Sequence, residues 1–145
     1  MNINNVTKSP LCEIRNSNSE CLLVFGWRNP FVALSNGNIA LVLAMAKRAG
    51  IPWDTILGAD LVGTYKPDAA IYDSASRLLD IAPSQVMMVA CHPGDLDAAK
   101  SRGLMTAYVH RPLEWGPGTE RALPEAGTYD LVCGSFVELA EVLGA

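Results

Sequence analysis

Residues 86–109 read VMMVACHPGDLDAAKSRGLMTAYV, and this stretch decides the fold class. Two apolar runs, Val86–Ala90 and Met105–Val109, have the length and composition of buried strands. Between them, residues 96–102 favour a helix, and Gly103 is typical of a helix end. Parallel strands need a crossover of about a dozen residues, so the stretch predicts a β-α-β unit.

The same alternation extends in both directions from this unit. Apolar runs and helix signals take turns along the chain, and the strands are apolar on both faces. This pattern predicts an α/β, three-layer, Rossmann-like fold with a mostly parallel sheet and helices on both sides. The further strands are expected at Phe31–Leu34, Asp60–Gly63 and Leu131–Cys133, and the further helices at 39–48, 67–79 and 135–143.

The first apolar run, Cys21–Phe25, lies much closer to the next run than the other predicted strands do. Only Gly26–Pro30 separates it from Phe31–Leu34. A connection this short joins neighbouring strands only in antiparallel order, so the sequence predicts a hairpin here. Residues 1–20 are rich in Asn and Ser and are expected to form a poorly ordered arm, which leaves 21–145 as one core domain.

Composition narrows the function classes. The chain has 145 residues, half of them apolar, and a net charge of −4, which excludes a disordered chain. Without a Lys/Arg cluster, a nucleic-acid partner is not expected. No apolar run approaches the roughly 18 residues of a membrane helix, and no signal peptide is apparent, so we expect no membrane partner and a cytoplasmic location. The spacing of the four cysteines, Cys12, Cys21, Cys91 and Cys133, suggests neither zinc nor a redox pair.

Three short segments carry a family resemblance. Residues 34–38 (LSNGN), 65–68 (YKPD) and 89–95 (VACHPGD) follow predicted strands or open a predicted helix. In this order they resemble the second, third and fourth motifs of the haloacid dehalogenase superfamily, most closely its 2-haloacid dehalogenase branch. The resemblance covers about residues 31–143, which is most of the chain.

The resemblance implies a nucleophilic reaction. In the family, an aspartate at the end of the first strand attacks the substrate, and water cleaves the resulting ester or acyl-phosphate. By this resemblance, Ser35 and Asn36 bind the anionic group of the substrate, Lys66 neutralises charge at the nucleophile, and Asp95 anchors the lysine or Mg²⁺. His92 lies where the branch commonly has Asn, which suggests a substrate contact.

The nucleophile motif of the family is missing. It should precede Ser35, yet the first aspartate of the chain is Asp54, and Gly26 stands at the expected position. Residues 27–34 leave no room for a cap domain. The sequence therefore predicts a truncated, catalytically inactive dehalogenase-like protein that retains a weak site for a small anion. We expect the place of the first strand to be taken by Cys21–Phe25 in antiparallel sense or by a second chain, and the protein to form a homodimer.

An alternative function remains open. The chain is then a hydrolase of the superfamily with a substitute nucleophile, either a 2-haloacid dehalogenase without cofactor or a Mg²⁺-dependent phosphatase. No other cofactor or metal site is expected.

The individual residues also have simpler interpretations. Asp95 is equally explained as a helix cap, and Ser35 with Asn36 as a turn. For Cys91, a small buried thiol is favoured over a nucleophile. Asp97 is more typical of a charge in the first turn of a helix than of a metal ligand.

Overall fold

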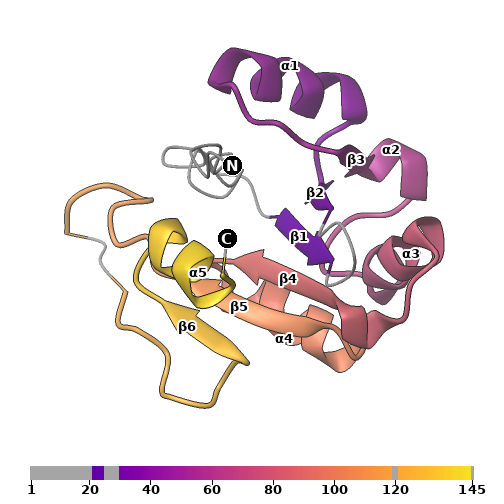
Figure 1. The fold of residues 1–145 in the computed structure, drawn as a ribbon. Coiled ribbons are helices and arrows are strands. Elements are labelled where there is room, and N and C mark those ends of the chain that lie inside the picture. The colour runs from indigo at the N-terminus through magenta and orange to yellow at the C-terminus, as the bar shows by residue number, and fades with distance from the viewer. Residues whose placement is uncertain (1–20, 25–29, 119–120, 145) are drawn as a thin grey trace, which may run out of the picture.

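A computed structural model describes residues 21–24, 30–118 and 121–144. Within these ranges the strands form a six-stranded sheet in the order β3-β2-β1-β4-β5-β6 (Figure 1). The strands are β1 (Cys21–Val24), β2 (Phe31–Ser35), β3 (Thr55–Gly58), β4 (Val86–Ala90), β5 (Met105–Val109) and β6 (Leu131–Cys133). The arm expected at 1–20 and Phe25, the last residue of the first predicted strand, lie outside the described residues.

Strand direction divides the sheet into three parts. β2 pairs with β3 in parallel, and β4, β5 and β6 are also parallel to one another. Between these two parts lies β1, which is antiparallel to both neighbours. Cys21 pairs with Ala33 of β2 and with Val89 of β4. The antiparallel pairing predicted for the first two apolar runs is confirmed, and the central position is filled from the same chain.

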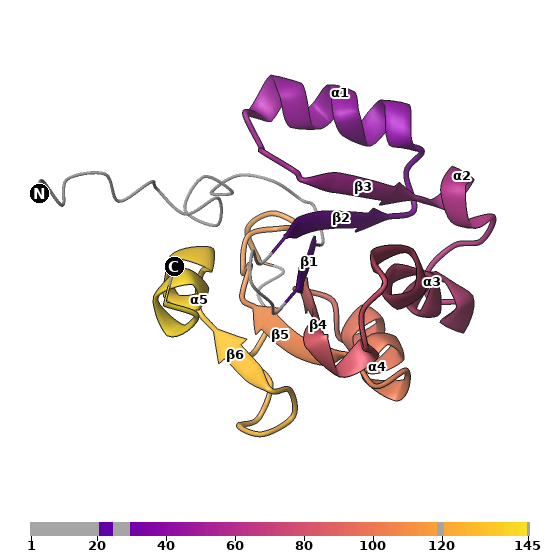
Figure 2. The ribbon, with the colours of Figure 1, turned by 45° about the vertical axis from the view of Figure 1, so that its right-hand side comes forward.

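Helices cover both faces of the sheet. They are α1 (Ile39–Ala49), α2 (Ala59–Val62), α3 (Ala69–Leu79), α4 (Pro93–Ser101) and α5 (Phe136–Val142), with a short 3-10 helix, η2 (Pro83–Gln85), before β4. One core cluster joins α3 and α4 to the sheet, and a second joins α1 and α5 to the opposite face (Figures 1 and 2). The predicted α/β fold with helices on both faces of the sheet is confirmed.

The side chains of β4 point alternately to the two faces of the sheet, and both faces are covered, which explains why its sequence is apolar throughout. Val86, Met88 and Ala90 belong to the core under α3 and α4, whereas Met87 and Val89 belong to the core under α1 and α5. All five residues are buried. A strand covered on both faces buries every side chain, so its sequence has no polar alternation.

One predicted strand is wrong. Residues 60–63 were expected to be a strand, but the strand of this region is β3, Thr55–Gly58, and Ala59–Val62 form α2. At Gly58, the last residue of β3, the backbone passes close to the start of α1, because an added Cβ would lie 2.9 Å from the amide nitrogen of Ile39. Asp60 accepts a hydrogen bond from that same amide, which joins the start of α2 to the start of α1.

None of the described helices is long and apolar enough to cross a membrane.

Candidate functional site

Polar side chains gather at the edge of the sheet where β2 and β4 end. Lys66 precedes α3, and Asp95 lies in the first turn of α4, directly after β4. The Nζ atom of Lys66 lies 2.9 Å from Oδ2 of Asp95. Only 7% of the lysine side chain and 6% of the aspartate side chain are exposed, so this ion pair is buried.

Tyr72 of α3 completes the surroundings of Asp95. Its hydroxyl donates a short hydrogen bond to Oδ1 of Asp95, and the tyrosine itself is fully buried. Both carboxylate oxygens therefore accept hydrogen bonds, one from an ammonium group and one from a phenol. A buried charge needs such partners, because unpaired it costs several kcal/mol. Asp95 does not cap α4: the N-cap position is His92, which makes no side-chain cap bond.

Asn36 holds the Lys66 segment from the other side. Its Oδ1 accepts a hydrogen bond from the Lys66 amide at 2.6 Å, and its Nδ2 donates to the Lys66 carbonyl at 3.4 Å. The Lys66–Pro67 peptide bond is cis. Asn36 therefore positions the backbone of the lysine, and the anion-binding role predicted for its side chain stays a prediction.

Ser35 ends β2 and makes a local turn. Its Oγ accepts a hydrogen bond from the amide of Gly37 at 3.0 Å. The turn expected as the simpler interpretation is confirmed by this bond. A hydroxyl can accept here and still donate its proton to an anion, so the predicted substrate contact remains a prediction.

A second group of side chains lies at the end of β4. The Cys91 thiol donates to Oε2 of Glu114 at 3.0 Å, and Nε2 of His92 lies 3.2 Å from the same oxygen. Glu114 belongs to the loop that follows β5. Cys91 is buried, as the preferred interpretation of this thiol predicted.

Two stacked tyrosines, Tyr108 and Tyr129, lie next to the group formed by Cys91 and Glu114. Burial raises the pKa of Tyr108, and the charges of Cys91 and Glu114 also raise it, whereas Arg121 lowers it. Tyr129 stacks on Tyr108 with the ring centroids 6.1 Å apart. Burial and a hydrogen bond to Asp97 raise the pKa of Tyr129 to about 12, so this phenol stays protonated at neutral pH.

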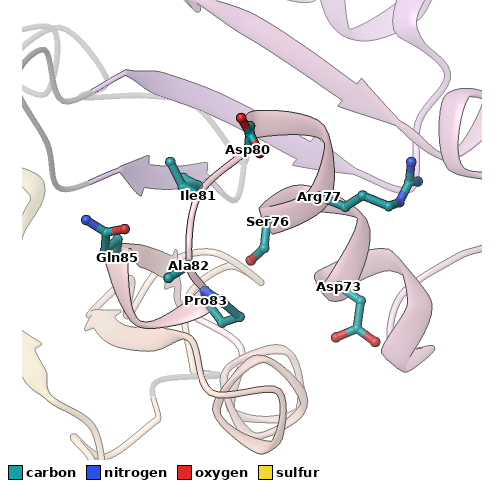
Figure 3. A pocket seen from close by; sticks show the side chains of 8 residues that line it. All are labelled: Asp73, Ser76, Arg77, Asp80, Ile81, Ala82, Pro83 and Gln85. Atoms are coloured by element: carbon teal, nitrogen blue, oxygen red, sulfur yellow. The ribbon is translucent and has the colours of Figure 1, made fainter.

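A separate pocket lies at the other end of β4. It has a volume of about 560 Å³ and lies between the second half of α3 and η2 (Figure 3). Ser76 extends from α3 toward Ala82 and Pro83, and Asp73 lines the same pocket (Figure 3). Among the described residues, the buried Oγ of Ser76 lacks a hydrogen-bond partner.

Comparison with known proteins gives a consistent picture for part of the chain. No protein-family model matches. The (S)-2-haloacid dehalogenase 1 of Pseudomonas sp. (strain CBS-3) is 36% identical over 94 residues, which cover 61% of this chain and 41% of that enzyme. A crystallised L-2-haloacid dehalogenase superposes with a TM-score of 0.74 and 49% identity, covering 78% of this chain and 48% of its own.

A crystallised defluorinating L-2-haloacid dehalogenase gives a TM-score of 0.74 at 45% identity, over 79% of this chain and 46% of its own. Over the matched part, this chain is a homologue of 2-haloacid dehalogenases. It spans about half the length of these solved structures. The predicted resemblance is confirmed for that part.

The Mg²⁺ of phosphatases in the superfamily does not fit the described residues. Mg²⁺ binds through oxygen ligands, mainly carboxylates and water. Both oxygens of Asp95 already accept hydrogen bonds, one of them from a lysine ammonium that repels a cation. Oδ1 of Asp97 accepts a hydrogen bond from Tyr129, so this carboxylate is engaged as well.

Sequence reasoning missed two residues of the site. Tyr72 has the helical spacing of a core residue, and nothing in its neighbours points to a carboxylate on another helix. Glu114 lies in the loop between β5 and β6, and a loop of this length is often functional. A loop has no periodicity, so the sequence could not say which of its residues returns to the end of β4.

Proposed function

We propose that this chain is a hydrolase of 2-haloacids in which Lys66 is the central electrostatic group. The buried pair of Lys66 and Asp95 is the observation that carries the proposal. A 2-haloacid is an anion, and the group that attacks its C2 carbon is electron-rich. A fixed ammonium offsets the repulsion between them, and it acts most strongly where water is excluded.

The reaction is a substitution followed by hydrolysis. A nucleophile displaces the halide from C2, and water then releases a 2-hydroxy acid, so the products are the hydroxy acid, a halide ion and a proton. We infer that the nucleophile is a substitute group, since no aspartate precedes Asp54 in the sequence. We also infer that β1 replaces the first strand of the homologous enzymes and that no cap domain lies between β1 and β2, because only residues 25–30 separate these two strands.

The missing aspartate favours a second candidate function. Removing the nucleophile of a covalent mechanism typically costs several orders of magnitude in rate. In this case the chain binds small anions near Ser35, Asn36 and Lys66 without turnover, and His92 contacts the bound anion.

Halide release from 2-chloropropionate tests the first proposal. We expect Lys66→Ala to lower the rate by about 100-fold or more, the scale seen when one charge-stabilising group is removed. Lys100→Ala is the matched control, because this exposed lysine donates to the Thr128 carbonyl and lies outside the site. It should leave the rate unchanged.

Two results would contradict the hydrolase. Release that persists in Lys66→Ala would exclude the proposed role of the lysine. No release from the unmodified protein, together with a thermal shift by 2-chloropropionate that Lys66→Ala abolishes, would favour anion binding alone. Phosphate release from p-nitrophenyl phosphate with and without Mg²⁺ tests the phosphatase.

A homodimer is a further proposal for this chain. The argument from an empty strand position no longer applies, since β1 fills it. Support now comes from exposed apolar side chains on α1 and beside it, Leu41, Met45 and Leu61, each about half exposed. Sedimentation at several concentrations should give the mass of two chains, and Leu41→Glu should lower it to one. A monomer at every concentration would exclude the dimer.

A further inference from the structure

We propose that Cys91, His92 and Glu114 form a binding site for a zinc-like divalent metal ion. The ligand atoms of the three side chains, one thiol sulfur, one imidazole nitrogen and one carboxylate oxygen, lie within 4.8 Å of one another. Two of them are neighbours in sequence, and the third arrives from the loop after β5. The three ligands are different residues from the Lys66 and Asp95 pair, and the proposal does not depend on turnover of a haloacid.

The distances match a tetrahedral ion. Zinc binds sulfur at about 2.3 Å and nitrogen or oxygen at about 2.0–2.2 Å, so its ligand atoms lie roughly 3.3–3.6 Å apart. In this structure the distances are 3.7 Å from sulfur to nitrogen, 3.2 Å from nitrogen to the carboxylate oxygen, and 3.0 Å from sulfur to that oxygen. An opening of a few tenths of an ångström between Cys91 and Glu114 would admit the ion.

The donor types select the kind of ion. Thiolate and imidazole are ligands of zinc and other borderline or soft metals, whereas Mg²⁺ and Ca²⁺ prefer oxygen. The thiol proton now lies in a hydrogen bond to Glu114. A bound ion would take the place of that proton, and its binding would release the proton to solvent.

Burial leaves one side of the site accessible. Cys91 is 9% exposed, and the side chain of Glu114 is also 9% exposed. The side chain of His92 is 32% exposed, so an ion can approach beside the imidazole. Three protein ligands leave a fourth position for water or a small anion, as in catalytic zinc sites.

Cobalt(II) titration of the full chain tests the proposal, because cobalt(II) reports both geometry and sulfur ligation in its spectrum. We expect the intense visible bands of four-coordinate cobalt(II) and a near-ultraviolet charge-transfer band from a thiolate. Zinc should displace the cobalt and remove both signals. Raising the pH should tighten binding, because the ligands must be deprotonated.

Three variants assign the ligands. Cys91→Ser should abolish the charge-transfer band, and His92→Asn should lower affinity more than about 100-fold, since even groups outside the ligand set cost about 10–100-fold. Glu114→Gln should weaken binding on the same scale. Cys133→Ser is the matched control: this buried thiol ends β6, and its loss should leave the spectrum unchanged.

Two results would contradict the proposal. A six-coordinate cobalt spectrum, or none at stoichiometric metal, would overturn it and leave Glu114 as a partner of Cys91 and His92 without a metal. A thiolate band that survives Cys91→Ser would also overturn it, because another cysteine would then be the ligand. His92→Asn keeps the test decisive if Cys91→Ser fails to fold, since His92 is the most exposed of the three side chains.

Discussion

The charged side chains at the two ends of β4 differ in their exposure to solvent. At the carboxyl end, the Lys66 and Asp95 side chains are only 7% and 6% exposed. At the amino end, near the pocket, Arg102 and Asp73 also form an ion pair at 2.8 Å, but their side chains are 41% and 47% exposed. The bond lengths are nearly equal, and the surroundings are not.

This difference shows that the presence of a pocket does not by itself identify a functional site. The pocket between α3 and η2 offers volume, but its charged residues are solvated, and water weakens their fields. The carboxyl end of β4 concentrates partly or fully buried Lys66, Asp95, Cys91 and Glu114, where water screens charge poorly. Chemistry is therefore expected where charge is buried, at the end of β4 that the homologous sequence motifs also mark.

The largest expected effect on stability comes from breaking the buried pair. Lys66→Ala leaves the Asp95 carboxylate without its cation, and we expect a loss of about 3–5 kcal/mol in the free energy of unfolding. Denaturant unfolding monitored by tryptophan fluorescence measures this loss. Arg102→Ala is the matched control, because exposed ion pairs contribute little. Its unfolding midpoint should stay close to that of the unmodified protein.

An equal loss of unfolding free energy in Lys66→Ala and Arg102→Ala would contradict the proposed difference between the two ends of β4. So would a Lys66→Ala protein as stable as the unmodified chain, because Asp95 would then not depend on the lysine. Asp95→Asn in the Lys66→Ala background sharpens the result: it removes the unpaired charge and should restore part of the stability.

A smaller effect is expected at the pocket. The Ser76 hydroxyl is buried without a partner among the described residues, which costs free energy in the folded state. Ser76→Ala removes that hydroxyl and places a better helix former in α3, so we expect a gain of about 1 kcal/mol in unfolding free energy. Denaturant unfolding measures it, with Ser74→Ala as the control, because the Ser74 hydroxyl donates to the Ile71 carbonyl. A loss in Ser76→Ala would mean that the hydroxyl has a partner, such as a ligand of the pocket.

The sequence predicted the parts of the fold that continuous apolar runs and short connections mark. The apolar runs at 86–90 and 105–109 and the short gap before Phe31 each identify a strand and its direction relative to a neighbour. The strand at Thr55–Gly58 was missed because four residues carry too little pattern to distinguish a strand from the helix that follows. The tight approach at Gly58 is set by contacts with α1, which are distant in sequence.

The same division holds for the site. Lys66 and Asp95 were predicted together because their motifs resemble those of the haloacid dehalogenase superfamily, and the structure places them 2.9 Å apart. Glu114 and Tyr72 were not predicted, because no sequence motif marks the loop or the helix position in which they lie. Their contacts with Cys91 and Asp95 depend on how the loop after β5 returns and on the rotation of α3, which only tertiary packing fixes.

The reversed direction of β1 has a consequence for redesign. Cys21 pairs with Val89 near the carboxyl end of β4, and Val24 pairs with Val86 at its amino end. The end of β1 therefore lies at the amino end of β4, away from Lys66. An engineer who wished to install an attacking carboxylate would gain nothing by restoring it after the strand, where a forward-running strand would carry it. The carboxylate belongs at the start of β1, because in this direction the start of the strand lies at the carboxyl end of β4, near Lys66.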